Sequence, residues 1–356
     1  MYRAFRDRFV KMPSDSIAAD TNQPAGPLLV VTIDTEEEGL WSGTFAETGT
    51  VTNIAGVPRF QKLCDEFRVR PTYLVDAPVV QSEEAVGILK PLQEQNRAEI
   101  GAHLHPWNTP PLVPLRSPAD SYLCNLSPKL QREKLQWLTQ AIAEKFGRMP
   151  ISFRAGRYGM GGDAIDVLRD LGYRVDSSVL PYTDYSSQGG PNYLRSTPEP
   201  YYPALRSLLG RGTDERLLEV PVTAGFTHRY FGTANRLRIK AMQKPWRAMR
   251  AVGVLDRTGI ARKVKLSPEQ ATLGEMKQLA RATCKRGVAV LVLMFHSSSL
   301  KPGCSPYVKD QADLDRFHER LRSFFSYCLS DLQCRPVTLG DCYGQRHRLA
   351  GKAALK

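Results

Sequence analysis

The sequence predicts an α/β fold, a distorted barrel of seven to eight β/α units. Short apolar runs, rich in β-branched and aliphatic residues, recur along the chain, and helix-like segments lie between most of them. Runs that are apolar at nearly every position are typical of parallel strands buried on both faces. Polar residues gather where these runs end, and active sites of such barrels lie at that rim.

Seven segments carry the strand pattern. Each spans six to nine residues, and they are LLVVTID (28–34), RPTYLVD (70–76), AEIGAHLH (98–105), ISFRAG (151–156), YRVDSSV (173–179), LLEVPV (217–222) and VAVLVLMFH (288–296). Between the third and the fourth, residues 127–147 begin with Ser-Pro and end with Gly, which are start and stop signals of a helix.

Length and composition favour one large domain. With 356 residues and 42% apolar content, the chain can bury a sizeable core. We expect a barrel domain at 27–340, after a flexible leader at 1–26 and before a basic tail at 341–356. Within the domain, a Gly-, Pro-, Ser- and Tyr-rich rim loop is expected at 182–216, and a basic insertion at 225–267.

Two features bear on the compartment. No apolar run approaches the eighteen or so residues of a membrane span, and the N-terminus lacks the apolar core of a secretory signal. The seven cysteines are scattered and form no CxxC pair, which suits a reducing compartment and gives little support to a cysteine-based metal site. We therefore expect a cytoplasmic protein.

The net charge of +13 is unevenly spread. Residues 236–265 hold ten Lys or Arg and one acid, Asp256, and apolar residues including Trp246 lie among them. Three interpretations remain open: a solvated surface, a membrane-surface helix or an anion-binding lid, and Pro245 interrupts any single long helix. We predict recruitment to an anionic surface, which leaves open peripheral attachment at the inner membrane face. Nucleic acid is not expected, because no recognised module accompanies the charge.

The polar residues at the predicted strand ends form the candidate site. In chain order they are Asp34, Glu36, His103, His105, Arg154, Asp176 and His296. Two imidazoles and a carboxylate are a common set for a divalent ion with open positions, and a further carboxylate could deprotonate water held there. Any one of these residues alone could instead be a loop cap.

At these residues the chain resembles the polysaccharide deacetylases of the NodB-homology type, carbohydrate esterase family 4. The resemblance covers roughly 28–339 and rests on five short motifs in the family's order, which are TIDTE (32–36), HLHPW (103–107), RAGRY (154–158), DSSV (176–179) and LMFH (293–296). A subgroup linked to surface polysaccharide and lipopolysaccharide biosynthesis is the most similar in character.

The resemblance implies roles for the matching residues. Asp34 would be the general base, paired with Arg154, and His296 would be the general acid, supported by Asp176. A divalent ion, zinc or a similar one, would be bound by Glu36 and the two histidines. A backbone N–H near Arg157 would help to hold the oxyanion. Separately from the resemblance, Trp41, Trp107, Tyr158 and Tyr182 could line a sugar-stacking groove, although aromatic residues near a barrel rim are about as often plain packing, and the expected substrate contacts are Trp107, Arg157 and Tyr158.

The first two motifs depart from the family pattern. Thr35 stands where the commonest first motif has its metal-binding acid, and Glu36 follows it. Trp107 stands where the second motif has its second histidine, and His105 lies two residues earlier. Side chains at i and i+2 of a strand point the same way, so we favour relocated ligands over a decayed site. Glu37 and Glu38 are expected to be solvated loop acids rather than partners of the ligands.

The resulting function is a metal-dependent hydrolase that removes an N-acetyl group from an acetamido sugar of a surface polysaccharide or its precursor. Two alternatives remain: an amidohydrolase acting on a small non-sugar C–N substrate, and a catalytically silent glycan-binding barrel. The sequence predicts neither the sugar nor the oligomeric state.

Overall fold

A curled sheet of parallel strands lies at the centre of the computed structural model, which describes residues 26–43, 45–246 and 248–350. The strand order is β11-β1-β2-β3-β4-β5-β8, and β12 pairs with the start of β1. The strands are β1 (Leu28–Thr35), β2 (Thr72–Val75), β3 (Glu99–Leu104), β4 (Ser152–Ala155), β5 (Val175–Asp176), β8 (Leu218–Glu219), β11 (Val290–His296) and β12 (Arg335–Val337). Every pairing in this sheet is parallel.

The sheet curls into a half-barrel with β8 and β11 at its two edges. Thr223, which follows β8 in the chain, is hydrogen-bonded to Val292 of β11. The Thr223 backbone N–H donates to the Val292 carbonyl at 3.2 Å, and the Val292 N–H donates to the Thr223 hydroxyl at 2.8 Å. The predicted distorted β/α barrel is therefore confirmed. Six of the seven predicted runs are longer than the strands they contain, most of all at 173–179 and 217–222, where β5 and β8 each cover two residues.

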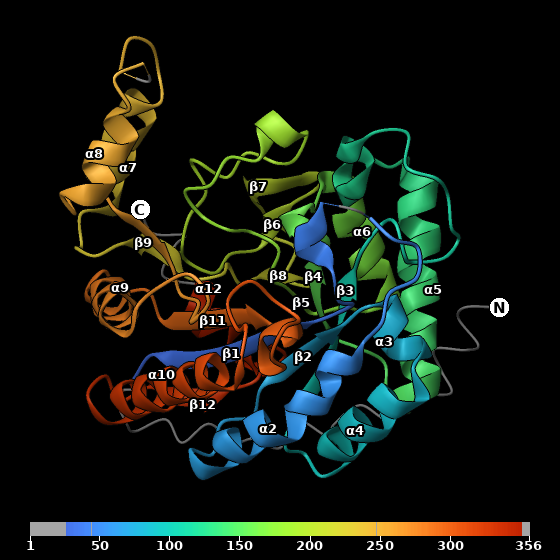
Figure 1. Cartoon of the computed structure of the whole chain (residues 1–356). Coiled ribbons are helices and arrows are strands. Elements are labelled where there is room, and N and C mark those ends of the chain that lie inside the picture. The colour runs from blue at the N-terminus through green and yellow to red at the C-terminus, as the bar shows by residue number, and fades with distance from the viewer. Residues whose placement is uncertain (1–25, 44, 247, 351–356) are drawn as a thin grey trace.

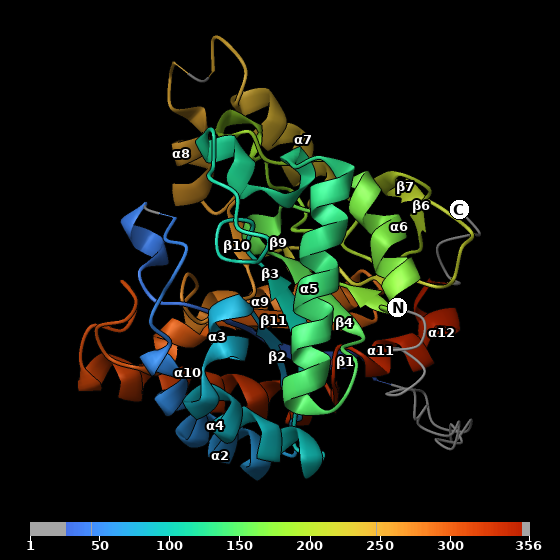
Figure 2. The ribbon, with the colours of Figure 1, turned by 90° about the vertical axis from the view of Figure 1, so that its right-hand side faces the viewer.

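Helices cover the outside of the sheet (Figures 1 and 2). They include α2 (Val57–Glu66), α3 (Ala77–Gln81), α4 (Glu83–Glu94), α5 (Pro128–Phe146), α6 (Gly162–Leu171), α9 (Leu273–Lys285) and α10 (Gln311–Ser330). As predicted, Ser127 caps the start of α5 through its side chain, and Gly147 ends the helix with a left-handed φ of 75° that suits glycine. A capping box of Thr272 and Glu275 starts α9.

The predicted rim loop is partly ordered by hydrogen bonds. Within 182–216, β6 (Pro203–Ala204) and β7 (Ser207–Arg211) form an antiparallel pair. At the other predicted margins, the leader at 1–25 and the tail residues 351–356 lie outside the described residues. Residues 341–350 of the predicted tail form α11 (Asp341–Gly344) and α12 (Arg346–Ala350).

The basic insertion forms an arm that projects from the body of the molecule in both views (Figures 1 and 2). Its base is an antiparallel pair of β9 (Ala224–Phe226) and β10 (Lys263–Lys265), and it carries α7 (Phe231–Ala241) and α8 (Ala251–Arg257). Pro245 lies between the two helices, as predicted. We call residues 229–262 the arm. Across the described residues, no helix combines the length and the apolar character that crossing a bilayer requires.

Candidate metal and catalytic site

The carboxyl ends of the parallel strands bring most of the predicted site residues together. Asp34 on β1 is the register partner of His296 on β11, and His103 on β3 is the register partner of Arg154 on β4. Because the strands are parallel and adjacent, residues far apart in the sequence meet at one rim. The rim is well buried, since Asp34 is 4% exposed and Arg154 is fully buried.

Glu36, His103 and His105 form a compact buried group. One Glu36 oxygen, Oε2, lies 3.1 Å from His103 Nε2 and 3.3 Å from His105 Nε2. One donor atom from each residue lies within 4.8 Å of the others, which is close enough for a shared metal ion. The expected i and i+2 geometry of the two histidines is therefore present, and both rings face Glu36.

The hydrogen bonds on the far side of each ring fix which nitrogen is free. His103 Nδ1 lies 3.0 Å from the Arg154 carbonyl oxygen, which can only accept, so Nδ1 carries the hydrogen. In the same way His105 Nδ1 faces the Glu37 carboxylate at 3.0 Å. Each Nε2 then faces the carboxylate of Glu36, and a metal cation placed between them would accept a lone pair from each nitrogen.

A divalent ion fits this donor set. The other carboxylate oxygen of Glu36, Oε1, is buried and has no hydrogen-bond partner among the described residues. Such an orphaned buried oxygen calls for a ligand or an ion. Burial by itself would raise the pKa of Glu36, but His296, His103 and His105 outweigh burial and lower it, so the carboxylate is ionised. Glu36, His103 and His105 are therefore the residues that would hold the ion.

Glu37 corrects a prediction, because it is not a solvated loop acid. Its side chain is 2% exposed and accepts hydrogen bonds from His105 Nδ1 and, at 2.8 Å, from Trp107 Nε1. Asp76 lies on its other side, where an Asp76 oxygen accepts from the Glu37 backbone N–H at 3.1 Å. Glu37 therefore orients a candidate metal ligand, which is the usual work of a carboxylate behind histidine. Glu38 is half-buried and accepts from Thr50 and Thr52.

Trp107 packs against a candidate metal ligand and does not line an open sugar groove. Its side chain is 2% exposed, and its ring stacks on His105 with centroids 4.2 Å apart and an interplanar angle of 21°. The backbone closes over the same histidine at Gly156, where an added Cβ would lie 2.2 Å from His105 Cδ2. Trp107 and Gly156 thus hold the His105 ring in place, and the sugar contact predicted for Trp107 does not fit this burial.

Asp34 and Arg154 form the predicted ion pair. Arg154 Nη1 lies 2.5 Å from Asp34 Oδ1, and the other guanidinium nitrogens donate to the Ser177 carbonyl and hydroxyl oxygens. Burial by itself would raise the pKa of Asp34, but Arg154, His103 and His296 outweigh burial and lower it to about 2. Asp34 is therefore a carboxylate held at a fixed position beside the Glu36 group.

His296 is held by Glu269, a residue that the sequence did not single out. His296 Nδ1 lies 2.9 Å from Glu269 Oε2, and the His296 backbone N–H donates to Glu269 Oε1 at 3.0 Å. The Ser299 hydroxyl donates to the same Oε1 at 2.6 Å. His296 Nε2 points toward Glu36 Oε1 at 4.0 Å, so the ring stands between Glu269 and the candidate ligand.

Asp176 does not take the place expected for it next to His296. Its carboxyl group accepts from the Ser178 hydroxyl and pairs with Glu219, and both acids are fully buried. Burial raises the pKa of Asp176 to about 6 and raises that of Glu219 well above its usual range. A shared proton between these two acids is the physical consequence, and Glu269 occupies the position beside His296 that was expected of Asp176.

The remaining predicted residues, Arg157 and Tyr158, lie in the turn that directly follows β4. Arg157 and Tyr158 both have left-handed backbone, with φ of 55° and 58°, a conformation that is rare outside glycine. The Arg157 guanidinium lies over the Tyr122 ring and donates to Gln188 at 2.7 Å. Trp41, 37% exposed, meets the His296 ring edge-on with centroids 5.4 Å apart. Trp41 is thus a solvent-exposed aromatic side chain in contact with His296.

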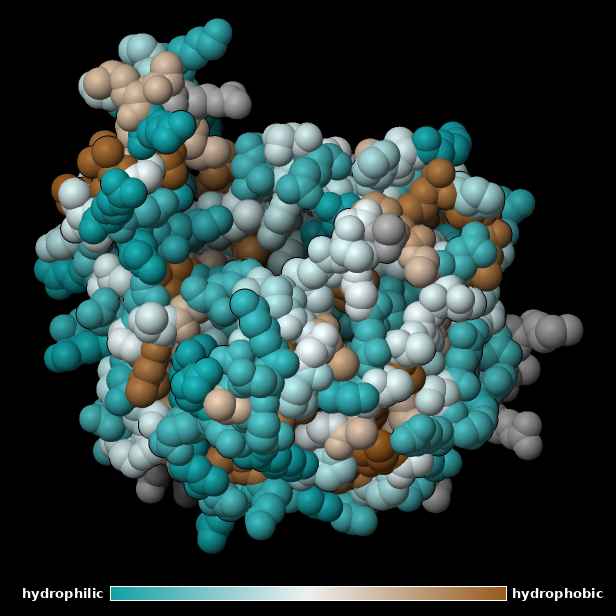
Figure 3. Space-filling model, in the orientation of Figure 1, coloured by the Kyte–Doolittle hydropathy of each residue, from teal (hydrophilic) through white to brown (hydrophobic). Residues whose placement is uncertain are grey.

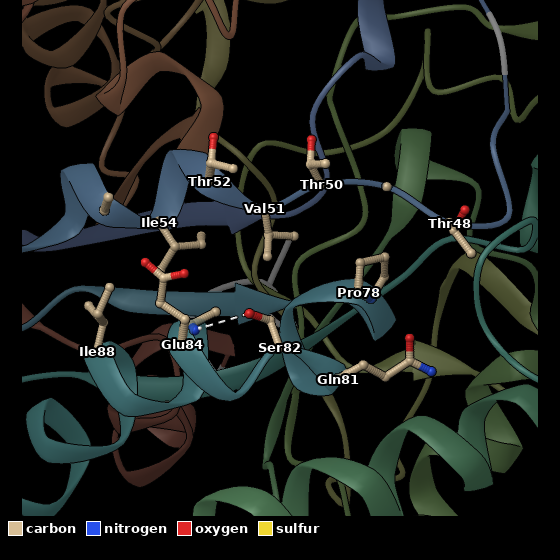
Figure 4. Close-up of a pocket in the computed structure, with 13 residues that line it drawn as sticks. Thr48, Thr50, Val51, Thr52, Ile54, Pro78, Gln81, Ser82, Glu84 and Ile88 are labelled. Carbon is tan, nitrogen blue, oxygen red and sulfur yellow. Dashed lines mark hydrogen bonds between the residues drawn. The ribbon is translucent and has the colours of Figure 1, made fainter.

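The larger of two described cavities, about 370 Å³, is separate from this group (Figure 4). It lies between residues 48–55 and the start of α3 and α4, where the Ser82 hydroxyl accepts from the Ala85 backbone N–H at 3.2 Å. Its lining contains one charged residue, Glu84, and no histidine. It offers no set of groups for catalysis or metal binding.

Comparison with known proteins shows what this fold is. No family model matches the chain, and no relative is found among curated proteins. Solved structures do match. A protein assigned to the polysaccharide deacetylases from Mycobacterium smegmatis has a TM-score of 0.52 at 16% identity, covering 92% of this chain and 93% of its own. A glycoside hydrolase or deacetylase from Parabacteroides distasonis has a TM-score of 0.61 at 11% identity, covering 92% of this chain and 73% of its own.

A further similar structure is an allantoinase, with a TM-score of 0.52 at 14% identity, covering 95% of this chain and 98% of that chain. At such low identities the likeness establishes the fold and leaves the substrate open. The chain therefore has the NodB-type barrel of the polysaccharide deacetylases, as the sequence motifs predicted.

Proposed function

We propose that this protein is a metal-dependent hydrolase that removes an N-acetyl group from an acetamido sugar, and that the sugar belongs to a surface polysaccharide or its precursor. One observation carries the proposal. Two charged pairs, Asp34 with Arg154 and His296 with Glu269, flank the group formed by Glu36, His103 and His105. The polysaccharide deacetylase fold supports the same chemistry.

Amide hydrolysis needs two proton transfers, and the proposal assigns one to Asp34 and the other to His296. A divalent ion, proposed to be zinc, would polarise the amide carbonyl and activate water when bound. Asp34 is ionised and would take a proton from the water that adds to the carbonyl carbon. His296 would give a proton to the nitrogen as the C–N bond breaks, while Glu269 stabilises the imidazolium. The products are acetate and a free amine.

Residues at the rim supply the proposed contacts to the sugar. The Trp41 ring, beside His296, offers an exposed aromatic face on which a sugar can pack. The left-handed backbone at Arg157 and Tyr158 is a local strain of the kind found where backbone N–H groups serve a site. We propose that an N–H of this segment binds the oxyanion.

Acetate release tests the proposal directly. Purified protein loaded with zinc should release acetate and an equal amount of free amine from N-acetylated chito-oligosaccharides. The Asp34→Asn variant should bind zinc and release neither. Zinc-loaded wild-type protein that releases no acetate from any N-acetylated saccharide, surface glycans included, would contradict the proposal and favour a silent glycan-binding barrel.

A small non-sugar amide is the second candidate substrate, because an allantoinase is among the similar structures. That alternative predicts turnover of a cyclic ureide such as allantoin and none of the saccharides. The two assays, run on one zinc-loaded preparation, separate the candidates.

The arm is the proposed site of recruitment to an anionic leaflet, at the inner membrane face. Exposed apolar and basic side chains lie side by side on it (Figure 3). Seven of the thirteen large apolar residues that are exposed in the described structure lie at 230–260, and they are Tyr230, Leu237, Met242, Trp246, Met249, Val254 and Ile260. So concentrated an apolar surface on a projecting element marks an interaction site.

The charge of the arm suits lipid headgroups rather than an apolar partner. Six exposed basic residues of the arm take part in no ion pair among the described residues, and they are Arg229, Arg236, Lys240, Lys244, Arg250 and Arg257. Each basic residue near an anionic leaflet contributes about 1 kcal/mol, and insertion of Trp246 and Met249 would add an apolar term that salt does not screen.

Co-sedimentation with vesicles tests the recruitment. The protein should pellet with phosphatidylserine-containing vesicles and far less with phosphatidylcholine vesicles. Lys244→Glu with Arg250→Glu should abolish the difference, whereas Lys129→Glu, an exposed lysine on α5, should not. No pelleting together with dimers that Met249→Asp dissociates would assign the arm to self-association instead.

A further inference from the structure

A second cavity, of about 330 Å³, lies at the base of the arm. Its walls come from β9 and β10 on one side and from residues 180–185 on the other, and Gln270 and Glu275 complete it. Gln270 follows directly after Glu269, the acid that holds His296. The cavity therefore begins next to the candidate catalytic site.

Basic side chains dominate this cavity. Arg262, Lys263 and Lys265 line it, against a single acid, Glu275. Glu275 is already engaged, because its carboxylate pairs with Arg262 and accepts from the backbone and side chain of Thr272 at the start of α9. The charges of Lys263 and Lys265 are therefore left without an acid in the cavity.

The two lysines lie on the same face of β10. Val264 between them packs into the core with 5% exposure, so period-two alternation turns Lys263 and Lys265 the other way. Lys263 Nζ donates to two neutral oxygens in the described part of the chain, the Thr183 hydroxyl at 3.0 Å and the Tyr182 carbonyl at 3.4 Å. The Lys265 ammonium group has no hydrogen bond or ion pair among the described residues, and the residue is half-buried.

Both ammonium groups carry an electrostatic cost that an anion would relieve. Burial, together with the nearby charges of Arg238 and Lys265, lowers the pKa of Lys263 to about 8. Burial also lowers the pKa of Lys265, against the opposing pull of Glu269 and Asp34. The backbone beside Lys265 is tied to the strand that carries His296, because the Leu266 carbonyl accepts from the Met294 backbone N–H of β11 at 3.1 Å. A ligand anion bound here would thus sit close to the reacting amide.

We propose that this cavity binds an anionic substituent of the acetamido substrate, a carboxylate or a phosphate, through Lys263 and Lys265. The inference rests on the proposed function and narrows it to acidic N-acetylated saccharides. Lysine ammonium groups bind such anions as point charges. A neutral acetamido sugar would offer neither lysine an anionic contact within the cavity and would bind more weakly.

Calorimetry with three matched monosaccharides tests the cavity. The probes are N-acetylglucosamine 1-phosphate, N-acetylmuramic acid, which carries a carboxylate, and the neutral methyl glycoside of N-acetylglucosamine. They are titrated into the zinc-loaded Asp34→Asn protein, which is expected to bind without turnover. We expect at least one anionic probe to bind at least tenfold more tightly than the neutral one at low salt. Whichever anionic probe is preferred identifies phosphate or carboxylate as the substituent.

Substitution of the two lysines tests whether the preference for anionic probes arises in this cavity. Lys263→Met and Lys265→Met, each in the same background, should reduce the ratio of anionic to neutral affinity at least threefold, and the double variant should bring it near one. Lys129→Met on the exposed face of α5 is the matched control and should leave the ratio as it was. Equal affinity for all three probes, no binding of any probe, or a ratio that survives the double variant would overturn the proposal.

The outcome is separable from that of the proposed function. Calorimetry measures binding and needs no turnover. If the wild-type protein fails to release acetate while the lysine-dependent preference is present, the deacetylase proposal fails and the anion site stands. If acetate is released equally well from acidic and neutral saccharides and no preference is seen, the anion site alone is wrong.

Discussion

Glu269→Gln is the substitution that most sharply probes the acid of the proposed reaction. The carboxylate lies 2.9 Å from His296 Nδ1, and glutamine keeps its shape while removing its charge. Burial by itself would lower the pKa of His296, but Glu269, Glu36 and Asp34 outweigh burial and raise it from 6.5 to about 9. Glu269 is the largest of the three carboxylate contributions, so its loss should lower the pKa by about one pH unit or more, which is about 1.4 kcal/mol per unit.

The sign of the effect follows from the role of His296. A general acid must be protonated, so activity is lost as the pH rises through its pKa. The alkaline limb of the profile of kcat/KM against pH should therefore lie about one pH unit or more lower in Glu269→Gln than in the wild-type protein. Acetate release, measured across the alkaline range at equal zinc loading, gives the alkaline limb of each of the two proteins.

Asp176→Asn is the matched control for this prediction. Asp176 contacts Ser178 and Glu219 rather than His296, so its substitution should move the limb much less. An alkaline limb at the wild-type position in Glu269→Gln would refute the reasoning. A limb that moves in Asp176→Asn alone would return the supporting role to Asp176.

Three other substitutions test the parts of the site separately. Asp34→Asn should keep its metal while kcat falls by roughly a hundredfold or more, and loss of metal would exchange the roles of Asp34 and Glu36. Trp107→Phe keeps the ring on His105 but removes the hydrogen bond to Glu37, so zinc affinity measured by chelator competition should fall about 10- to 100-fold; an unchanged affinity would make Trp107 a packing residue only. Gly156→Ala places a Cβ 2.2 Å from His105 Cδ2 and should lower both zinc affinity and, by about 1–3 kcal/mol, the free energy of unfolding in urea; a variant equal to wild type in both would show that the backbone can move away.

Local sequence signals were enough to place the strands and the residues at their ends. β1 is buried along its whole length, as its apolar run predicts, and parallel pairing then brings Asp34 next to His296 without further information. The i and i+2 spacing of His103 and His105 likewise fixes that both rings face one side. These features depend on periodicity within single strands, which the sequence displays.

The residues that the sequence did not place depend on segments packed from a distance. Glu269 lies in an irregular stretch after the arm, and only the docking of that stretch against β11 brings it to His296. Glu37 has the composition of a loop acid, and its burial results from Trp107 and His105 closing over it. Asp176 was misassigned because its partner, Glu219, comes from β8, whose pairing with β5 no local pattern reveals.

The most direct test of the proposed centre is the metal content of the purified protein. Elemental analysis after dialysis against zinc should find one equivalent of zinc in the wild-type protein and in His228→Ala, a histidine on the arm side of the molecule that contacts the Ile260 carbonyl. His103→Ala and His105→Ala should each lose that equivalent, because each substitution removes one of the three donor residues, which are Glu36, His103 and His105. Stoichiometric zinc in both variants would contradict the assignment of this site.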